Sequence, residues 1–287
     1  MSDITLRIAS LHIHPVKSCA GLDVGQALLT PTGLQFDRRW MVVDPDRRFV
    51  TQRQLPRMAL VKPTLGAGLE GLVLTAPGQP ALTLDHHAAG RPCRVTVWND
   101  DVAARDLGDE AAQWLSRFLG RPLRLVAFEP EQPPRLSSRE WTGEIEAPNH
   151  FSDGFPVLVA STAGLAELNR RLAERGQPAV GIERFRPNLV LDGLEDANGE
   201  DFIDVLRFGA EGGPVVLKLV KPCVRCTIPS VDPASGEQGH EPGDTLSGYR
   251  ADSRMRGGIT FGMNAVVVEG VGRVLRAGMP GEATLAF

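Results

Sequence analysis

The sequence predicts an α+β protein that is rich in β-strands and divided into two parts. Its 287 residues have ordinary globular composition, 42% hydrophobic and 23% charged, and this length suits two modest domains or one large β-rich domain. Short strand-like segments bounded by Gly, Pro and Asp outnumber helical patterns. A polar, Pro-rich stretch over residues 129–150 has no sustained period and is interpreted as a connecting loop.

The first part is predicted to contain mostly short strands, closed by one helix. The strands are expected over residues 4–14, 40–44, 71–76, 94–98 and 123–128. The helix follows Asp109, where apolar residues recur with the 3.6-residue helical period, and Gly120 suits its left-handed C-terminal cap. Because Trp98, Trp114 and most Phe residues fall inside these patterns, they are assigned to hydrophobic cores.

The second part repeats the mixture of strands with one helix. Strands are expected over residues 156–160, 188–191, 215–220 and 264–268. A helix capped by Ser161 or Thr162 follows the first of them and ends near Gly176. The sequence thus predicts one domain over residues 1–128 and a second over residues 129–287.

Composition excludes several classes of protein. No apolar run approaches the ~20 residues that a membrane span needs, and the first residues do not resemble a secretory signal. The net charge of -4 argues against a nucleic-acid binder. Four cysteines cannot build a disulfide scaffold. We therefore expect a cytoplasmic protein that contacts neither membrane nor nucleic acid.

The most informative motif is Cys223-Val224-Arg225-Cys226, which directly follows a predicted strand and so is expected on a loop. Four interpretations remain open. The two cysteines could contribute to a zinc site, form a redox pair, or simply fill a tight turn. Alternatively, one thiolate could act as a ligand for a soft or high-valent metal, with Lys221 and Arg225 favouring the anionic form.

Three further clusters place basic residues beside predicted strands. They are HPVKSCAG at 14–21, FDRRW at 36–40 and FRPN at 185–188. Arg and Lys side chains bind phosphate well, so together these clusters predict an anion pocket. His12 and His14 alternate on the first strand and are interpreted as structural residues. The glycine-rich nucleotide loops, H-E-x-x-H and G-x-S-x-G are absent from the sequence.

Taken in order, these motifs resemble the MOSC-domain molybdenum proteins, in particular the amidoxime-reducing component family and its bacterial relatives. HPVKSC-x-G, DRRW, VW-x-D at 97–100 and the helix at 111–120 resemble the family's N-terminal β-barrel domain. FSDGFPVLV at 151–159, FRPN, PCVRC-x-x-x-x-VDP-x-x-G at 222–236 and FG-x-N at 261–264 resemble its MOSC domain. The resemblance implies an N-terminal β-barrel-like domain and a C-terminal β-barrel domain with a few helices.

The resemblance also implies a cofactor and its ligands. In the family a cysteine at the position of Cys226 binds molybdenum held by molybdopterin, which would make Cys226 both the metal ligand and the catalytic residue. The implied phosphate-binding residues are Lys17, Ser18, Arg38 and Arg186. Residues implied near the pterin or the metal are Asn188, Val224, Arg225 and Asn264, with Asp153 ranked lower. The resemblance further associates the chain with pyridoxal phosphate binding.

The implied reaction is the reduction of an N-hydroxylated compound to the N–H compound and water. No cysteine follows Cys226, so an iron–sulfur domain like that of some bacterial relatives is not expected. Electrons are therefore expected from a separate donor protein, such as a ferredoxin-, flavodoxin- or cytochrome-type reductase chain. The alternative implied by the resemblance is a non-catalytic protein that binds the molybdenum cofactor or carries sulfur.

Overall fold

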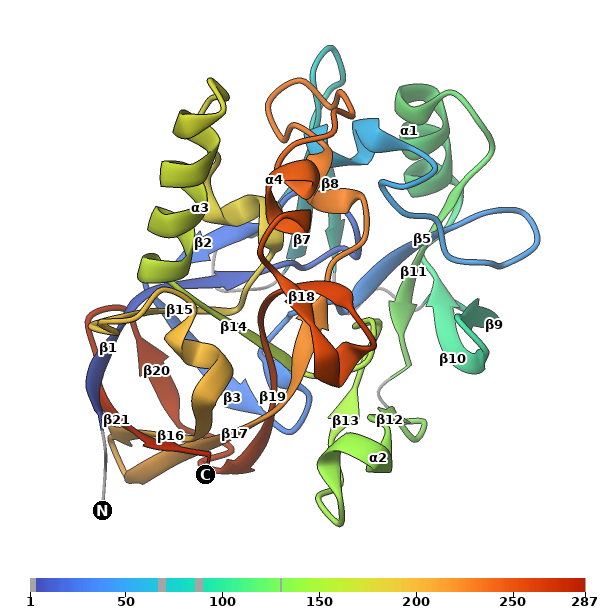
Figure 1. Ribbon diagram of the computed structural model, residues 1–287. Helices are drawn as coiled ribbons and strands as arrows, with labels where there is room; N and C mark the ends of the chain where they lie inside the picture. Colours follow the sequence, from blue (N-terminus) through green and yellow to red (C-terminus); the bar gives the residue numbers. More distant parts are fainter. Residues whose placement is uncertain (1–3, 67–70, 86–89, 130, 287) are drawn as a thin grey trace.

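Seven strands close into a barrel in the computed structural model, which describes residues 4–66, 71–85, 90–129 and 131–286 (Figure 1). Around the barrel the strands are β14 (Val157–Ser161), β15 (Leu189–Asp192), β1 (Ile4–Ile13), β21 (Pro280–Leu285), β16 (Ile203–Ala210), β17 (Gly213–Val224) and β19 (Gly258–Glu269). The ring closes because β19 also pairs with β14. The β-rich fold class predicted from the sequence is thus confirmed.

Alternating side chains explain why these segments form a barrel. In β1, Leu6 and Ile8 are buried while the alternate residues Thr5, Arg7 and Ala9 are exposed, as expected for a strand with one face on a core. Leu189, Leu217 and Ala265 from other strands are fully buried in the same core. The barrel interior is therefore a packed hydrophobic core rather than a channel.

Only β14 and β15 run parallel among the paired strands of the ring. A parallel pair needs a crossover connection, and α3 (Thr162–Glu174) supplies it on the outside of the barrel. Ser161 caps this helix, since its hydroxyl accepts a hydrogen bond from the Gly164 amide at 3.0 Å. The predicted helix is confirmed, and Ser161 rather than Thr162 is its cap.

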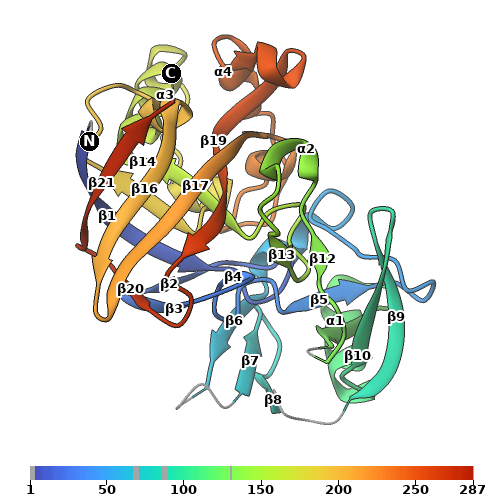
Figure 2. The same cartoon turned by 90° about the horizontal axis from the view of Figure 1, so that it is seen from below.

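Two smaller sheets and a helix make up most of the first part of the chain, beside the barrel (Figure 2). One sheet contains β5 (Trp40–Val43), β11 (Arg124–Phe128), β10 (Asp100–Asp106) and β9 (Arg91–Val97), and the other contains β6 (Lys62–Leu65), β7 (Gly71–Thr75) and β8 (Leu82–Asp85). The helix α1 (Asp109–Leu119) buries Trp114, Leu115 and Phe118, and Gly120 ends it with a φ of 76°. The predicted helix and its glycine cap are confirmed.

Short elements complete the fold. They are β2 (Leu22–Val24), β3 (Gln26–Thr30), β4 (Gly33–Leu34), β12 (Arg135–Leu136), α2 (Arg139–Thr142), β13 (Pro148–Asn149), α4 (Gly243–Ser247), β18 (Ala251–Asp252) and β20 (Val274–Arg276). Because β12, α2 and β13 lie inside residues 129–150, that stretch is not a plain loop: β12 and β13 pair as a small ladder. The division into two domains at residues 128 and 129 stays a prediction. Strand β1, from the predicted first domain, lies in the barrel between β15 and β21.

Two further sequence-based expectations were wrong. Strand β17 continues to Val224, so Cys223 lies on the strand and only Cys226 lies beyond it. Trp98 is not a core residue, since 43% of it is exposed. It occupies the turn between β9 and β10 with a φ of 57°, where its ring packs on Phe49 with centroids 5.0 Å apart. No helix in the described part of the chain is long and apolar enough to cross a membrane.

Candidate functional site

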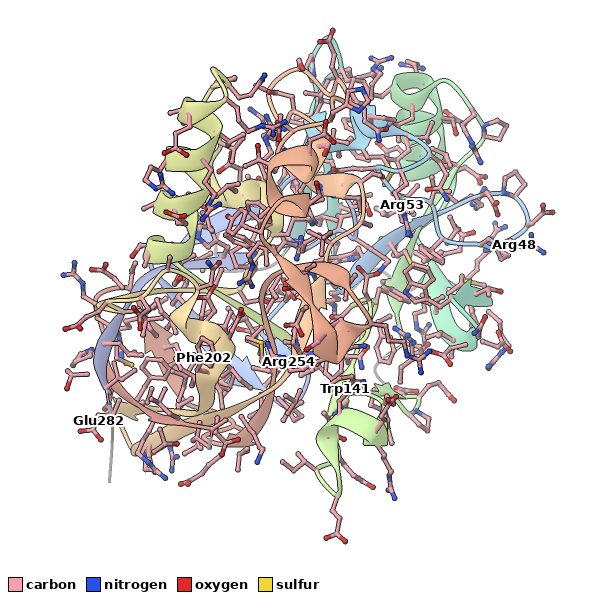
Figure 3. The ribbon with its side chains drawn as sticks, in the orientation of Figure 1. Arg48, Arg53, Trp141, Phe202, Arg254 and Glu282 are labelled. Atoms are coloured by element: carbon pink, nitrogen blue, oxygen red, sulfur yellow. The ribbon has the colours of Figure 1, made fainter. Side chains whose placement is uncertain are left out.

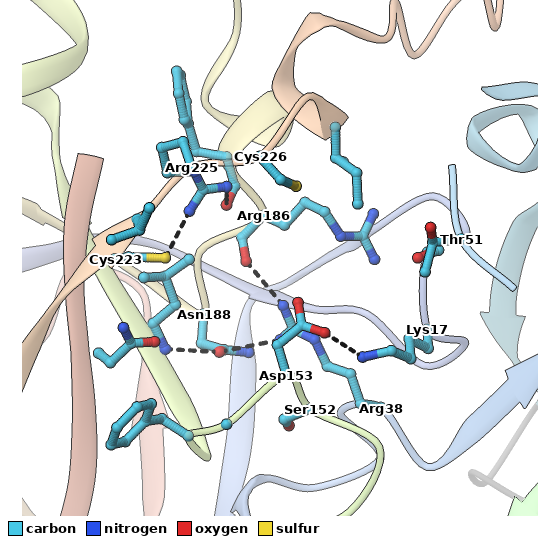
Figure 4. A pocket seen from close by; sticks show the side chains of 18 of the residues that line it. Lys17, Arg38, Thr51, Ser152, Asp153, Arg186, Asn188, Cys223, Arg225 and Cys226 are labelled. Carbon is cyan, nitrogen blue, oxygen red and sulfur yellow. Dashed lines mark hydrogen bonds and ion pairs between the residues drawn. The ribbon is translucent and has the colours of Figure 1, made fainter. Parts of the chain in front are cut away.

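All ten residues singled out as site residues line one cavity of about 270 Å³ between the barrel and the smaller sheets (Figure 4). Val224 ends β17 and Asn264 lies on β19, whereas the others lie in loops beside strands. Segments far apart in the sequence therefore meet here. The ten residues are Lys17, Ser18, Arg38, Asp153, Arg186, Asn188, Val224, Arg225, Cys226 and Asn264.

Backbone pairing brings the first three segments together. Residues 14–17 run beside residues 38–40, where the Lys17 amide donates to the Trp40 carbonyl at 2.8 Å and the Arg38 amide donates to the His14 carbonyl at 3.0 Å. The Phe151 amide then donates to the Arg38 carbonyl at 3.1 Å. The sequence motifs around Lys17, Arg38 and Asp153 therefore share one edge of the cavity.

Asn188 holds the barrel side of the cavity in place. Its side-chain oxygen accepts from the Leu158 amide at 3.0 Å and from Arg38 Nη1 at 3.2 Å, and its side-chain nitrogen donates to the His12 carbonyl at 3.2 Å. Asn188 is only 1% exposed. Its amide thus ties together β1, β14 and the Arg38 loop, and most of its hydrogen-bonding capacity is used by the protein itself.

Arg186 carries the clearest sign of an anion site. Its Nη1 donates to the Cys19 carbonyl at 2.5 Å, whereas its Nη2 is buried without a hydrogen-bond partner among the described residues. Burial and the neighbouring charge of Arg38 lower the pKa of Arg186 to about 10. Buried guanidinium donors are normally paired, so an unpaired one facing a cavity indicates room for an acceptor.

Lys17 and Asp153 form an ion pair at the wall of the cavity. Lys17 Nζ donates to Asp153 Oδ1 at 2.5 Å and to the Phe151 carbonyl at 2.8 Å. Burial lowers the pKa of Lys17, and Asp153 partly offsets this effect. The Asp153 side chain is exposed to the cavity. Desolvation raises its pKa, while the charges of Lys17, Arg38 and Arg53 more than compensate and lower it to about 2. The carboxylate therefore stays ionised at neutral pH.

Strained backbone concentrates at this cavity. Ser18, Arg38, Trp98 and Arg186 all have positive φ angles, between 47° and 63°. Such angles are uncommon for residues other than glycine and cost of order 1–3 kcal/mol each when strained. The left-handed backbone turns these side chains toward the cavity, and its retention here is typical of a functional site.

The two cysteines of the motif have different surroundings. Cys223 Sγ accepts a hydrogen bond from Arg225 Nη1 at 2.9 Å, whereas Cys226 lies beyond the strand with its side chain exposed to the cavity. Arg225 also donates to the Phe185 carbonyl at 2.9 Å, and its Nε is buried without a described partner. Both thiols are free. In the described residues, no group of three or more His, Cys, Asp or Glu gathers as a metal site.

Val224 and Asn264 occupy the floor between the cysteine loop and β19. Val224 is 46% exposed, so a ligand in the cavity can contact its side chain. Asn264 lies on β19 and its side-chain nitrogen donates to the Lys221 carbonyl at 3.2 Å. This bond lies beside an irregularity in the pairing of β17 with β19, between Leu219 and Lys221.

Sequence reasoning missed several residues that line the cavity. The principal ones are Thr51, Arg53, Trp98, Ser152, Phe155 and Phe185. Arg53 lies in the loop after β5 and its guanidinium stacks over Trp98 at 4.9 Å, while Trp141 on α2 contacts Lys221 at 5.0 Å (Figure 3). No sequence motif marks Thr51 or Arg53. The polar residues after Trp98 in the VW-x-D motif could have predicted an exposed turn. The hydrophobicity of Trp98 instead favoured its assignment to a core.

The side chains of His12 and His14 contact other groups of the protein, which agrees with their interpretation as structural residues. His12 contacts Asp23 at 2.5 Å and Ser10 at 2.8 Å. The His14 ring contacts the Pro187 carbonyl at 3.1 Å. Burial, with the nearby charges of Arg38 and Arg186, holds the pKa of His14 well below its usual range. A neutral, buried imidazole of this kind supports the loop that carries Lys17.

The fold and cavity define a two-domain MOSC protein. Residues 5–122 match the MOSC N-terminal beta barrel domain and residues 146–280 match the MOSC domain. The chain is 36% identical over 251 residues to mitochondrial amidoxime-reducing component 1 of Mus musculus, with 85% of this chain and 71% of that protein covered. It is 37% identical over 256 residues to the Homo sapiens protein of the same name, with 85% and 72% covered.

The chain therefore belongs to the amidoxime-reducing component family. Mitochondrial amidoxime reducing component 2 of Bos taurus is a further relative, 37% identical over 254 residues, with 85% of this chain and 72% of that protein covered. Among solved structures, the YUAD protein of Bacillus subtilis aligns over 99% of this chain and 97% of its own, with 13% identity and a TM-score of 0.41. Nothing about function follows from a TM-score this low.

Proposed function

We propose that this protein is a molybdenum-cofactor-dependent oxidoreductase that reduces N-hydroxylated compounds to the corresponding N–H compounds and water. Membership of a family whose relatives are named for amidoxime reduction supports the reaction class, and the MOSC domain supports the cofactor. The observation that carries the proposal is the exposed Cys226 thiol beside a cavity that holds an unpaired, buried Arg186 donor.

The residues present fit a molybdopterin-type cofactor. Such a group has an anionic phosphate at one end and a metal that needs a further soft ligand at the other. The cavity offers the first partner through Arg38, Lys17 and the unpaired Nη2 of Arg186, and the second through Cys226. Thiolates are suitable ligands for soft or high-valent metals, and guanidinium groups are suited to phosphate.

We infer the following roles for the chain's own residues. Lys17, Ser18, Arg38 and Arg186 bind the phosphate, and Asp153 positions the Lys17 ammonium. Asn188, Val224, Arg225 and Asn264 surround the pterin, with Arg225 also fixing the cysteine loop against Phe185. Cys226 binds the metal. When bound, the cofactor supplies a redox centre that takes up two electrons and releases them to the substrate.

Electrons are proposed to come from a separate ferredoxin-, flavodoxin- or cytochrome-type donor protein, in the cytoplasm. The cavity supports this arrangement because it is open: Cys226 is exposed and Val224 is 46% exposed. A bound centre at this position would lie near the protein surface. Electron transfer between proteins requires this kind of access.

The test is to purify the protein from a host that makes molybdenum cofactor. Molybdenum is measured by elemental mass spectrometry and pterin by fluorescence after oxidation. We expect about one of each per chain in the unaltered protein, a loss of molybdenum and activity in Cys226→Ser, and a much milder effect in Cys223→Ser. The reason is that Cys226 is exposed, whereas Cys223 Sγ, which lines the same cavity, accepts a hydrogen bond from Arg225.

The outcomes separate the alternatives. Equal losses from Cys226→Ser and Cys223→Ser would contradict a single-thiolate ligand and indicate a dithiol or zinc site. Cofactor binding without turnover of an N-hydroxy compound by a chemically reduced donor would indicate a carrier. Zinc or no metal, from a host that loads a known molybdenum enzyme, would refute the cofactor assignment.

A further inference from the structure

A second cavity lies on the other side of Cys226. It has a volume of about 710 Å³ and shares two lining residues, Arg225 and Cys226, with the first cavity. The segment after Cys226 and the segment leading into α4 form its other walls. Cys226 therefore lines both cavities, and its side chain is exposed.

The two cavities differ in charge. The first is lined by five basic side chains, Lys17, Arg38, Arg53, Arg186 and Arg225, and by one carboxylate, that of Asp153. The second is lined by Arg225, His240 and Asp244 together with neutral polar residues such as Thr227 and Gln238. An anionic cofactor is favoured in the first cavity, whereas the second suits an uncharged, hydrogen-bonding molecule.

His240 is presented to the second cavity by a well-fixed backbone. Its carbonyl accepts from Ser230 Oγ at 3.1 Å and from the Asp244 amide at 3.3 Å. Just before it, the Gly239 amide donates to the Ser230 carbonyl at 2.8 Å, and Val231 forms a β-bridge with Gln238. The residue is exposed, and within the described chain its imidazole has no hydrogen-bond or ion-pair partner. The ring is thus free to contact a ligand.

The proposed reaction needs protons near the reacting nitrogen. The N–O bond breaks, two electrons from the donor enter, one proton goes to the departing hydroxyl to make water, and a second proton goes to the nitrogen. Carboxylic acids are ordinarily ionised at neutral pH and Lys and Arg hold their protons too tightly, whereas imidazole titrates near pH 6.5. His240 is the only histidine that lines either cavity, within the described residues.

We propose that the second cavity admits the N-hydroxy substrate and that His240 donates the proton to its departing hydroxyl group. This inference rests on the proposed function and extends it to the substrate side of Cys226. Substrates would be uncharged and compact near the N–OH group. They would also carry groups that can form hydrogen bonds with the side chains of Thr227 and Gln238. The first cavity would hold the anionic cofactor, apart from the substrate in the second cavity.

The charged groups around His240 are few. Arg225, Cys226 and Asp244 face the same cavity. The adjacent Glu241 is engaged elsewhere, since its carboxylate lies 3.3 Å from Arg175 and accepts from the Thr245 amide at 2.9 Å.

The experiment compares the unaltered protein, His240→Gln and Gln238→Ala, all purified with cofactor and assayed for molybdenum content. Acetamidoxime serves as substrate and reduced methyl viologen as electron donor, so the result is independent of the natural donor protein. We expect His240→Gln to lower kcat at least tenfold, with unchanged molybdenum content. Gln238→Ala, which removes a hydrogen-bonding side chain of the same cavity but no proton donor, should raise KM rather than lower kcat.

A binding measurement accompanies the kinetics. With histidine labelled in its ring, the NMR signal missing from His240→Gln identifies His240, and this signal should shift when acetamidoxime is added. No shift, together with an unchanged kcat in the variant, would overturn the inference while leaving the reductase proposal standing. A shift without any turnover by the loaded, unaltered protein would instead contradict the proposed function and support only the binding cavity.

Discussion

Replacing Asn188 by alanine removes three hydrogen bonds at one point of the fold. The substitution deletes the acceptor of the Leu158 amide at 3.0 Å, the acceptor of Arg38 Nη1 at 3.2 Å and the donor to the His12 carbonyl at 3.2 Å. Asn188 is 1% exposed, so water cannot readily replace the lost groups. The change therefore perturbs stability and cavity geometry together.

The magnitude follows from the groups left unpaired. Each buried donor or acceptor without a partner costs ~1–3 kcal/mol. The Leu158 amide and the His12 carbonyl lose a partner each, while Arg38 keeps its bonds to Asp37 and to the Arg186 carbonyl. Counting only the two backbone groups, we expect Asn188→Ala to lower the free energy of unfolding by about 3 kcal/mol.

Urea unfolding followed by circular dichroism measures this change. The matched control is Asn264→Ala, which lines the same cavity, is half-buried and loses only one bond, to the Lys221 carbonyl. It should cost about 1 kcal/mol. If Asn188→Ala costs no more than Asn264→Ala, the assignment of Asn188 as the tie between β1, β14 and the Arg38 loop is refuted.

Two further predictions concern the buried end of α3. Burial raises the pKa of Glu200 from 4.5 to about 7. Between these two pH values the folded chain therefore holds a proton that the unfolded chain has released. The stability that this group contributes is present in full below pH 4.5 and is lost as the pH rises through 7. Urea unfolding at several pH values should show this decline, and Glu200→Gln should abolish it; an equal slope in the variant would contradict the assignment. Ser161→Ala should lower the free energy of unfolding by about 1–2 kcal/mol because the helix loses its cap on Gly164. Thr162→Ala, which removes a hydroxyl that donates to Asp192 at 2.9 Å, should destabilise the protein less in thermal unfolding. A larger loss from Thr162→Ala than from Ser161→Ala would make Thr162 the effective cap.

Periodicity located the long elements but not the short strands. The apolar stripe of Trp114, Leu115 and Phe118 was enough to predict α1, and a buried run was enough to predict β14. The strands β3 and β20 pair only with each other and a two-residue neighbour, so their sequences carry little of the alternation that a larger sheet imposes. Closure of the barrel depends on β19 pairing with β14, a long-range contact that no local pattern encodes.

The candidate site was predictable where a chemical requirement fixed the residue type. Basic residues beside strand ends and a cysteine after a strand are visible in sequence, and the structure gathers Lys17, Arg38, Arg186 and Cys226 around one cavity. Trp98 was placed in the core because its hydrophobicity is visible and its left-handed turn is not. His240 gave no signal at all, since its relation to Cys226 arises from the bridge of Val231 with Gln238.

The position of β1 has a consequence for the order in which the molecule is built. This strand, from the beginning of the chain, sits between β15 and β21, whose residues are synthesised much later. The cluster around Trp40, Leu72 and Leu115 draws its members from residues 16–127, so it can assemble while β1 still waits for its neighbours. We expect the ring to close last, and slowly, because contacts so distant in sequence carry the largest loop-closure cost. During synthesis, the end of β1 can already pair with β2, whereas the part that meets β15 and β21 is an open strand edge that a chaperone could protect.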